Sequence, residues 1–204
     1  MKVRIAILSL SLAAFSAPLI AQAATVTSGP VQVSASVNAL QQFNCTILQH
    51  NTPTDAGTLV TTMNFGQLAR PVDATGTPLA LASTSFFQVS CAINTSGKGY
   101  TLTQTGTALT AGTATLPAGA YVFTPLNITT GPGAYPAGGT VSARGSAVRT
   151  AAGWYAHPTG AAGVIQATYG ITNDAANGAT QFIAPDQAAG AYTGQVTWTL
   201  TINP

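Results

Sequence analysis

The side chains that could carry acid–base or metal chemistry are few and scattered. The carboxylates are Asp55, Asp73, Asp174 and Asp186, and glutamate is absent from the whole sequence. Each aspartate stands in a turn-like context, where it usually accepts hydrogen bonds from the nearby backbone. Isolated turn aspartates do not supply the paired carboxylates that general acid–base catalysis uses.

Neither the histidines nor a serine completes a catalytic or metal-binding group. His50 and His157 have no second ligand at the spacing of a metal site. Ser146, in Arg-Gly-Ser-Ala-Val, lacks the second glycine of a nucleophile elbow. We therefore expect a protein that is not an enzyme and that binds no metal or cofactor.

The cysteines offer redox chemistry. The chain has two, Cys45 and Cys91, and an isolated pair in an oxidising compartment most simply forms one disulfide. Closing a loop of this length would stabilise the fold by roughly 4 kcal/mol. The alternative is a pair of free buried thiols.

The first 23 residues indicate the compartment. Lys2 and Arg4 precede an apolar run that reaches Ile20, and Ala21-Gln22-Ala23 matches the small-x-small cleavage pattern. Residues 1–23 therefore predict a secretory signal peptide. The alternative, a membrane anchor, is disfavoured because the apolar run is short and rich in serine. We expect passage through the periplasm to the cell surface.

The charge balance changes when this leader is removed. Residues 24–204 carry four basic side chains against four aspartates, so the mature chain has no formal net charge. No basic patch remains for a row of phosphates, and we expect no nucleic-acid partner. Abundant threonine, glycine, alanine and serine favour a β protein whose hydroxyl-rich surface is buried in an assembly or a coat.

The side-chain pattern predicts strands and no helix. Threonine and glycine interrupt every window that could hold a 3.6-residue period, whereas two-residue alternation recurs. Val31, Val33, Ala35 and Val37 alternate with polar residues and predict a half-buried first strand. Further strands are expected at 43–47, 59–65, 86–93, 100–104, 121–123, 126–128, 141–148, 164–171 and 192–202.

Two regions carry more specific expectations. The Ser-Gly-Lys-Gly turn at 96–99 predicts that 86–105 is a hairpin, whereas the strand order within 107–163 stays open. From 192 to 202 apolar residues occupy one face and polar residues the other, as in a strand between a core and water. Many short strands joined by turns predict an all-β, immunoglobulin-like β-sandwich.

Three features together resemble the subunits of chaperone–usher pili, including the archaic branch related to spore coat protein U. They are the alternating strand after the leader, the cysteine pair with Met-Asn-Phe-Gly-Gln-Leu at 63–68 between its members, and the closing run Ala-Gly-Ala-Tyr-Thr-Gly-Gln-Val-Thr-Trp-Thr-Leu-Thr-Ile-Asn-Pro at 189–204. The resemblance covers most of 24–105 and 164–204.

This resemblance implies an incomplete sandwich that polymerises by donor-strand exchange. A donor extension at 24–38 would precede the sandwich at 39–204, and its row of Val31, Val33, Ala35 and Val37 would fill a groove in the next subunit. The implied partners are further copies in a fimbrium that supports adhesion or biofilm formation, a periplasmic chaperone and an outer-membrane usher. The alternative is that 31–37 pairs within its own domain.

Two other functions stay open. One is a non-fibrous surface or coat protein. The other follows from Tyr192 and the Val-Thr-Trp-Thr-Leu run at 196–200, which are similar to the closing signature of the WxL cell-wall-binding domain. The other Trp-x-Leu element of that family is missing, because Trp154 is followed by Tyr155 and alanine. In their Gly-, Ala- and Pro-rich context, Trp154 and Tyr155 are candidates for an exposed aromatic contact or for the packing of a loop.

Overall fold

The computed structural model describes residues 41–126, 135–149 and 152–204. The chain divides into two units, 1–37 and 38–204, and all the described residues belong to the second. The predicted strand at 31–37 therefore lies outside the described residues.

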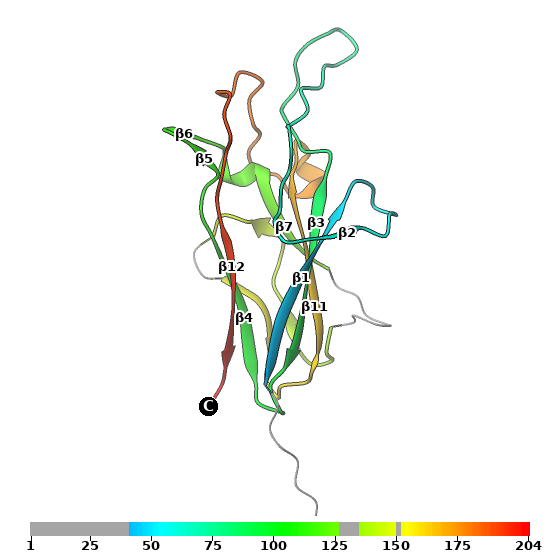
Figure 1. Cartoon of the computed structure of the whole chain (residues 1–204), viewed down its shortest axis with the longest axis vertical. Helices are drawn as coiled ribbons and strands as arrows, with labels where there is room; N and C mark the ends of the chain where they lie inside the picture. The colour runs from blue at the N-terminus through cyan, green and yellow to red at the C-terminus, as the bar shows by residue number, and fades with distance from the viewer. Residues whose placement is uncertain (1–40, 127–134, 150–151) are drawn as a thin grey trace, which may run out of the picture. The chain divides into compact units, whose positions relative to one another are not determined.

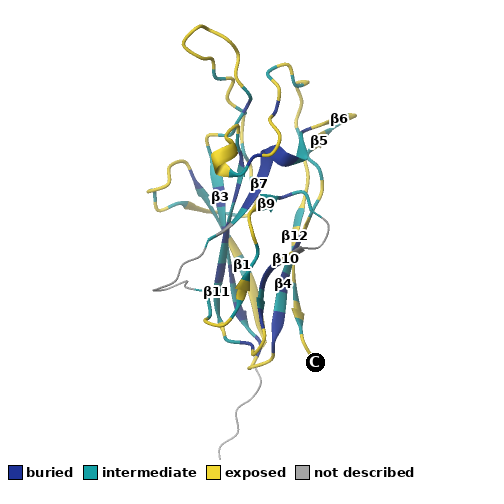
Figure 2. Cartoon of the chain, turned by 180° about the vertical axis from the view of Figure 1, so that it is seen from behind, coloured by how far each residue is buried: buried dark blue, intermediate teal, exposed yellow. Residues whose placement is uncertain are grey.

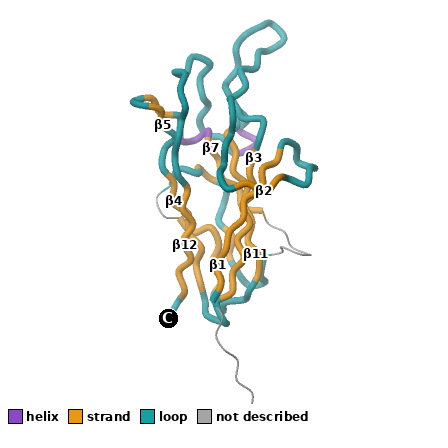
Figure 3. Tube along the Cα trace, in the orientation of Figure 1, coloured by secondary structure: helices purple, strands orange, loops and turns teal. Residues whose placement is uncertain are grey.

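Antiparallel strands form two main sheets (Figure 1). In spatial order the first contains β2 (Thr58–Val60), β1 (Gln42–His50), β3 (Phe86–Asn94), β11 (Gly163–Ile171), β7 (Tyr121–Leu126) and β9 (Gly145–Ser146). The second contains β12 (Val196–Ile202), β4 (Tyr100–Gly106), β10 (Ala152–His157) and β8 (Thr140–Val141). The other described elements are the pair β5 (Thr110–Ala111) and β6 (Ala114–Thr115) and the short 3-10 helices η1 (Ala118–Ala120) and η2 (Ala175–Asn177) (Figure 3).

The two sheets pack against each other through alternating side chains. Tyr100 and Leu102 of β4 are buried in the core, opposite a fully alternating row on β3. The buried members of that row are Phe87, Val89, Cys91 and Ile93. Buried residues follow the strands, whereas the long loops are mostly exposed (Figure 2). The predicted all-β sandwich is confirmed.

Cys45 and Cys91 form the predicted disulfide. The two residues are direct partners in the β1–β3 ladder, and their Cα atoms are 4.0 Å apart. Cys91 is fully buried. The bond therefore ties β1 to the core of the first sheet.

The predicted hairpin at 86–105 is wrong. β3 pairs with β1 and β11, whereas β4 pairs with β12 and β10 in the other sheet. The turn at 96–99 instead carries the chain from one sheet to the other, with Ser96 and Gly97 at positive φ, 54° and 83°. Alternation in both strands shows which side chains face inward, but it does not identify the neighbouring strand.

Two predicted strands are shorter or more broken than expected. Within the expected strand at 59–65, only Leu59 and Val60 are paired, as part of β2. No strand of the described chain lies beside residues 61–65. The expected strand at 141–148 is two short pieces, β8 and β9, which belong to different sheets.

Of the two roles considered for Trp154 and Tyr155, the exposed contact is wrong, because the two side chains are only 0% and 1% exposed. The β10–β4 register shifts between Gly153 and Tyr155. Such an irregularity re-aims side chains, so two successive residues of β10 are buried. Trp154 meets Phe123 edge-on, with ring centres 5.6 Å apart, and Tyr155 stacks on Tyr135 at 5.3 Å.

Candidate functional site

Two strands, β12 in one sheet and β1 in the other, have an edge that is unpaired over much of its length within the described residues. Within the described residues β12 pairs only with β4, so its second edge has no neighbouring strand (Figure 1). β1 pairs with β3 throughout, but its other edge pairs with β2 only from Ile47 to Gln49. Open edges present backbone N–H and C=O groups that can pair with a further strand.

The inward face of β12 is apolar but incompletely covered. Along this strand Thr197, Thr199 and Thr201 are exposed, and the residues between them are only half-buried. Those half-buried residues are Val196, Trp198, Leu200 and Ile202. By contrast, the inward residues of the neighbouring strand β4 are fully buried from Tyr100 to Gln104. The outer strand therefore exposes apolar surface that its inner neighbour does not.

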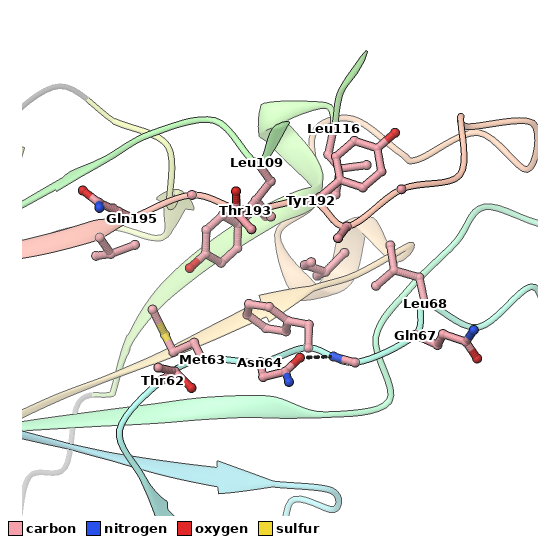
Figure 4. Close-up of a pocket in the computed structure, with 18 of the residues that line it drawn as sticks. Thr62, Met63, Asn64, Gln67, Leu68, Leu109, Leu116, Tyr192, Thr193 and Gln195 are labelled. Atoms are coloured by element: carbon pink, nitrogen blue, oxygen red, sulfur yellow. Dashed lines mark hydrogen bonds between the residues drawn. The ribbon is translucent and has the colours of Figure 1, made fainter. Parts of the chain in front are cut away.

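A groove of about 1170 Å³ lies beside this face. Residues 187–198 line one side and residues 61–68 the other, and Ile47 of β1 also contributes. Figure 4 shows Tyr192 and Leu109 facing Met63 and Asn64 across the opening. Small-molecule pockets usually measure about 300–1,000 Å³ and enclose most of their ligand. A larger groove that runs beside a strand edge fits an extended peptide segment better.

The segment 61–68 forms a wall without being a strand. Met63, Phe65 and Leu68 are half-buried, and Thr62 and Asn64 are exposed, as in an extended chain with one face inward. Phe65 packs edge-on against the buried rings of Phe87 and Tyr121, at 4.9 and 5.5 Å.

The backbone of this wall is available for pairing. In the part of the chain that the structure describes, residues 61–68 make no backbone–backbone hydrogen bond. Their backbone bonds go to side chains: Asn64 accepts from the N–H of Gly66 at 3.0 Å, and the carbonyl of Phe65 accepts from Ser83 at 3.0 Å. Most of the segment can therefore hydrogen-bond an incoming strand.

The groove has little charge. Of the described residues that line it, Arg70 is the only charged one, and its guanidinium donates to the carbonyl of Pro185 at 2.5 Å. Burial raises the pKa of Tyr121, so this lining phenol stays protonated near neutral pH. Within the described ranges no three His, Cys, Asp or Glu side chains gather where they could hold a metal ion. The described lining offers apolar contact and backbone pairing.

The aspartates lie in the turns that the sequence suggested. Asp55 accepts backbone N–H groups of Asn51 and Thr52 at 2.8 and 3.0 Å, which lower its pKa to about 2. The hydroxyl of Thr75 is the first of several donors that lower the pKa of Asp73. Asp174 accepts the N–H of Ala176 at 2.8 Å. The turn-capping role is confirmed for these three.

Both histidines hold loops in place. His50 is buried, its Nδ1 lies 2.6 Å from Asp55 Oδ1, and its ring stacks on Phe86 at 5.1 Å. His157 Nδ1 accepts backbone N–H groups of Thr159 and Ala161 at 3.2 and 3.3 Å. These contacts lie outside the groove lining.

The site residues expected from the sequence divide into two sets. The proposed donor row of Val31, Val33, Ala35 and Val37 lies outside the described residues. The disulfide lies beside the open edge of β1, and Trp198, expected on an apolar core face, is half-buried and lines the groove. Sequence reasoning missed Leu109 and Leu116 as lining residues, because they stand in a region whose strand order it left open.

No protein-family model, curated protein or solved structure matches this chain. None of the helices in the described ranges has the length and apolar content needed to cross a bilayer. What the groove binds is therefore inferred from its own geometry.

Proposed function

We propose that this chain is a structural subunit of a secreted surface fibre, in which a strand from a second copy fills the groove. The half-buried apolar row of β12, next to the unpaired edge of that strand, carries this proposal. Apolar surface left in contact with water is costly, and an open edge invites strand addition. One extended segment with apolar residues at every second position would cover the apolar surface and pair with the open edge.

The segment 31–37 has the required pattern. Its apolar row contains three valines and Ala35, and serine or glutamine occupies each position between them. Full burial of one valine contributes roughly 1.5–3 kcal/mol. Backbone bonds to β12 on one side, and to 61–68 or β1 on the other, would add to this and fix the direction of the strand.

In the proposed fibre, the segment of one copy enters the groove of the next. Gln42 pairs with Asn94 at one end of β1, whereas the groove is lined from Ile47 onward, toward the opposite end of that strand. A contact that joins one end of a subunit to a different surface of the next is heterologous and builds filaments when it does not close. Such a chain would need a periplasmic chaperone to cover its groove in transit and an outer-membrane usher for export to the cell surface.

A matched pair of variants tests the proposal. In full-length secreted protein, Val33→Asp places a charge in the apolar row, whereas Ser34→Asp places the same charge on the opposite face of the same segment. Burying an unpaired carboxylate costs several kcal/mol, so Val33→Asp should abolish assembly and Ser34→Asp should preserve it. Electrophoresis in SDS without boiling, with electron microscopy of the secreted material, measures assembly.

The results distinguish the two possible roles of 31–37, donation to a second copy and pairing within its own domain. Wild-type ladders that disappear in Val33→Asp but remain in Ser34→Asp support the fibre. A wild-type protein that is a stable monomer, and that Val33→Asp destabilises, would show that the segment completes its own domain. The protein would then be a non-fibrous surface or coat protein.

A further inference from the structure

A buried polar side chain lies behind the groove. Gln104 is on the inward face of β4 and is fully buried. A buried amide is costly unless its donor and acceptor are both used. Gln104 Nε2 donates to the carbonyl of Ala147 at 3.0 Å, and its Oε1 accepts the hydroxyl proton of Tyr169. Both ends of the amide are therefore occupied.

Tyr169 connects this amide to the groove wall. Its side chain, on β11, is fully buried, and its hydroxyl oxygen accepts the indole N–H of Trp198 at 2.8 Å. Burial raises the pKa of Tyr169, so the hydroxyl keeps the proton that it donates to Gln104. Gln104 and Trp198 are direct partners in the β4–β12 ladder, and the hydroxyl of Tyr169, on the opposite sheet, hydrogen-bonds both side chains. The three residues thus form a relay of directed hydrogen bonds across the core.

The relay fixes how Trp198 faces the groove. An indole has one N–H and no acceptor, and here that donor is used toward the core. The rings of Trp198 and Tyr169 meet edge-on, with centres 6.2 Å apart at 70°. Trp198 lines the groove and is half-buried. Its exposed part therefore presents carbon, without a polar hydrogen, to whatever fills the groove.

We infer that Gln104 and Tyr169 are positioning residues for the groove: they hold the Trp198 indole so that an incoming apolar strand meets a preformed apolar wall. This inference rests on the proposed function, because it needs a strand to bind there. Preorganisation strengthens binding by removing the ordering that would otherwise accompany it. Without the Tyr169 hydroxyl, the indole N–H loses its partner, and the ring is free to turn this donor toward the groove.

If Tyr169 had only a structural role, replacing another buried tyrosine by phenylalanine should have the same effect on the bound strand. Tyr100 is a suitable control, because it is also buried and, within the described residues, its hydroxyl donates one hydrogen bond, to the carbonyl of Ala161 at 3.1 Å. It does not line the groove and does not contact Trp198 through a hydrogen bond. Removing the Tyr169 hydroxyl breaks two hydrogen bonds and removing that of Tyr100 breaks one, so both should reduce stability, Tyr169→Phe more, but only Tyr169→Phe should affect the bound strand.

The experiment compares Tyr169→Phe, Gln104→Leu and Tyr100→Phe in full-length assembled protein. The rate at which SDS-resistant multimers dissociate on heating measures strand retention. Weaker positioning of Trp198, equivalent to the loss of one hydrogen bond, corresponds to about a tenfold faster dissociation for Tyr169→Phe and Gln104→Leu. The double variant should be no faster than the single ones, because both break one relay. Tyr100→Phe should stay within about twofold of wild type.

A spectroscopic measurement follows the indole itself. The chain has two tryptophans, so Trp154→Phe leaves Trp198 as the sole emitter. Tyr169→Phe should shift its emission and increase acrylamide quenching, whereas Tyr100→Phe should not. If Trp154→Phe does not fold, quenching is measured with Trp154 retained, since that side chain is fully buried.

The measurements distinguish a failure of the positioning role from a failure of the proposed function. Wild-type multimers with equal dissociation rates in Tyr169→Phe and Tyr100→Phe, or with unchanged Trp198 quenching, would overturn the positioning role alone. A wild-type protein that forms no multimers would overturn the proposed function and this inference with it.

Discussion

β11 and β12 have the same two-residue alternation but different burial. On β11 the inward residues Ile165, Ala167 and Tyr169 are each 0% exposed. On β12 the inward residues from Val196 to Ile202 are only half-buried. β11 lies between β3 and β7, whereas the described neighbours of β12 are on one side only.

This difference shows what alternation encodes. A period of two selects the side chains that face inward, but their burial depends on strands elsewhere in the sequence. β11 obtains its cover from its own domain. β12 has the alternating apolar residues of a core strand, but the described chain does not cover them. Such a surface is expected where another segment completes the fold.

The largest predicted effect is a difference between β11 and β12 in how an aspartate substitution affects folding. Ile165→Asp on β11 puts a charge in a sealed core and should cost more than about 4 kcal/mol, enough to prevent accumulation of folded protein. Val196→Asp on β12 can reach water through the groove and should cost the single subunit no more than about 2 kcal/mol. It should nevertheless abolish multimers. Yield, circular dichroism and SDS electrophoresis measure these effects. Equal loss of folding in both variants would show that β12 is covered within its own chain.

The next effect concerns the open edge of β1. Replacing Cys45 and Cys91 together by serine removes the bond that ties this strand to β3 and should lower the free energy of unfolding by roughly 4 kcal/mol. Urea unfolding of wild type and variant measures the change. Intact-mass analysis should find about two hydrogens fewer in the untreated protein than after reduction. Free thiols in the secreted protein would contradict the pairing in Cys45–Cys91.

Much of the fold could be predicted because local patterns encode it. The alternation of 164–171 and the Cys91 strand at 86–93 indicated two strands and their inward faces, and both are present. The pairing of strands could not be predicted in the same way. The turn at 96–99 is compatible with a hairpin and with a crossing between sheets, and long-range packing selects the crossing.

The candidate site was predictable only in part. The apolar face of 192–202 was evident, but its incomplete burial depends on an opening that no local pattern reveals. Residues 61–68 contain a recognisable motif, yet their role as a wall comes from Phe65 packing on Phe87 and Tyr121. Trp154 shows the opposite error: its glycine-rich flank suggested a loop, and a register shift in β10 buries it.

The smallest predicted effect is in the turn that joins β1 to β2, at the open side of the first sheet. Asp55 accepts the N–H groups of Asn51, Thr52 and Gly57 and contacts His50, and its pKa falls from 3.8 to about 2. A carboxyl whose pKa is lower in the folded state stabilises the fold above its unfolded pKa. That contribution is lost as the pH falls from about 3.8 through about 2.

Asp55→Asn should therefore lower the melting temperature at pH 7 by a small amount, and the difference from wild type should shrink as the pH falls toward 2. The amide cannot accept the same set of N–H groups with a negative charge, so the variant lacks the pH-dependent part of the stability. Asp186→Asn is the control, because that carboxylate makes no hydrogen bond to the described chain and its substitution should leave the melting curve unchanged. Melting curves of all three proteins at pH 7, 4 and 2 measure the effect. An Asp55→Asn deficit that is absent at pH 7, or that is undiminished at pH 2, would show that this carboxylate does not anchor the turn beside the open edge.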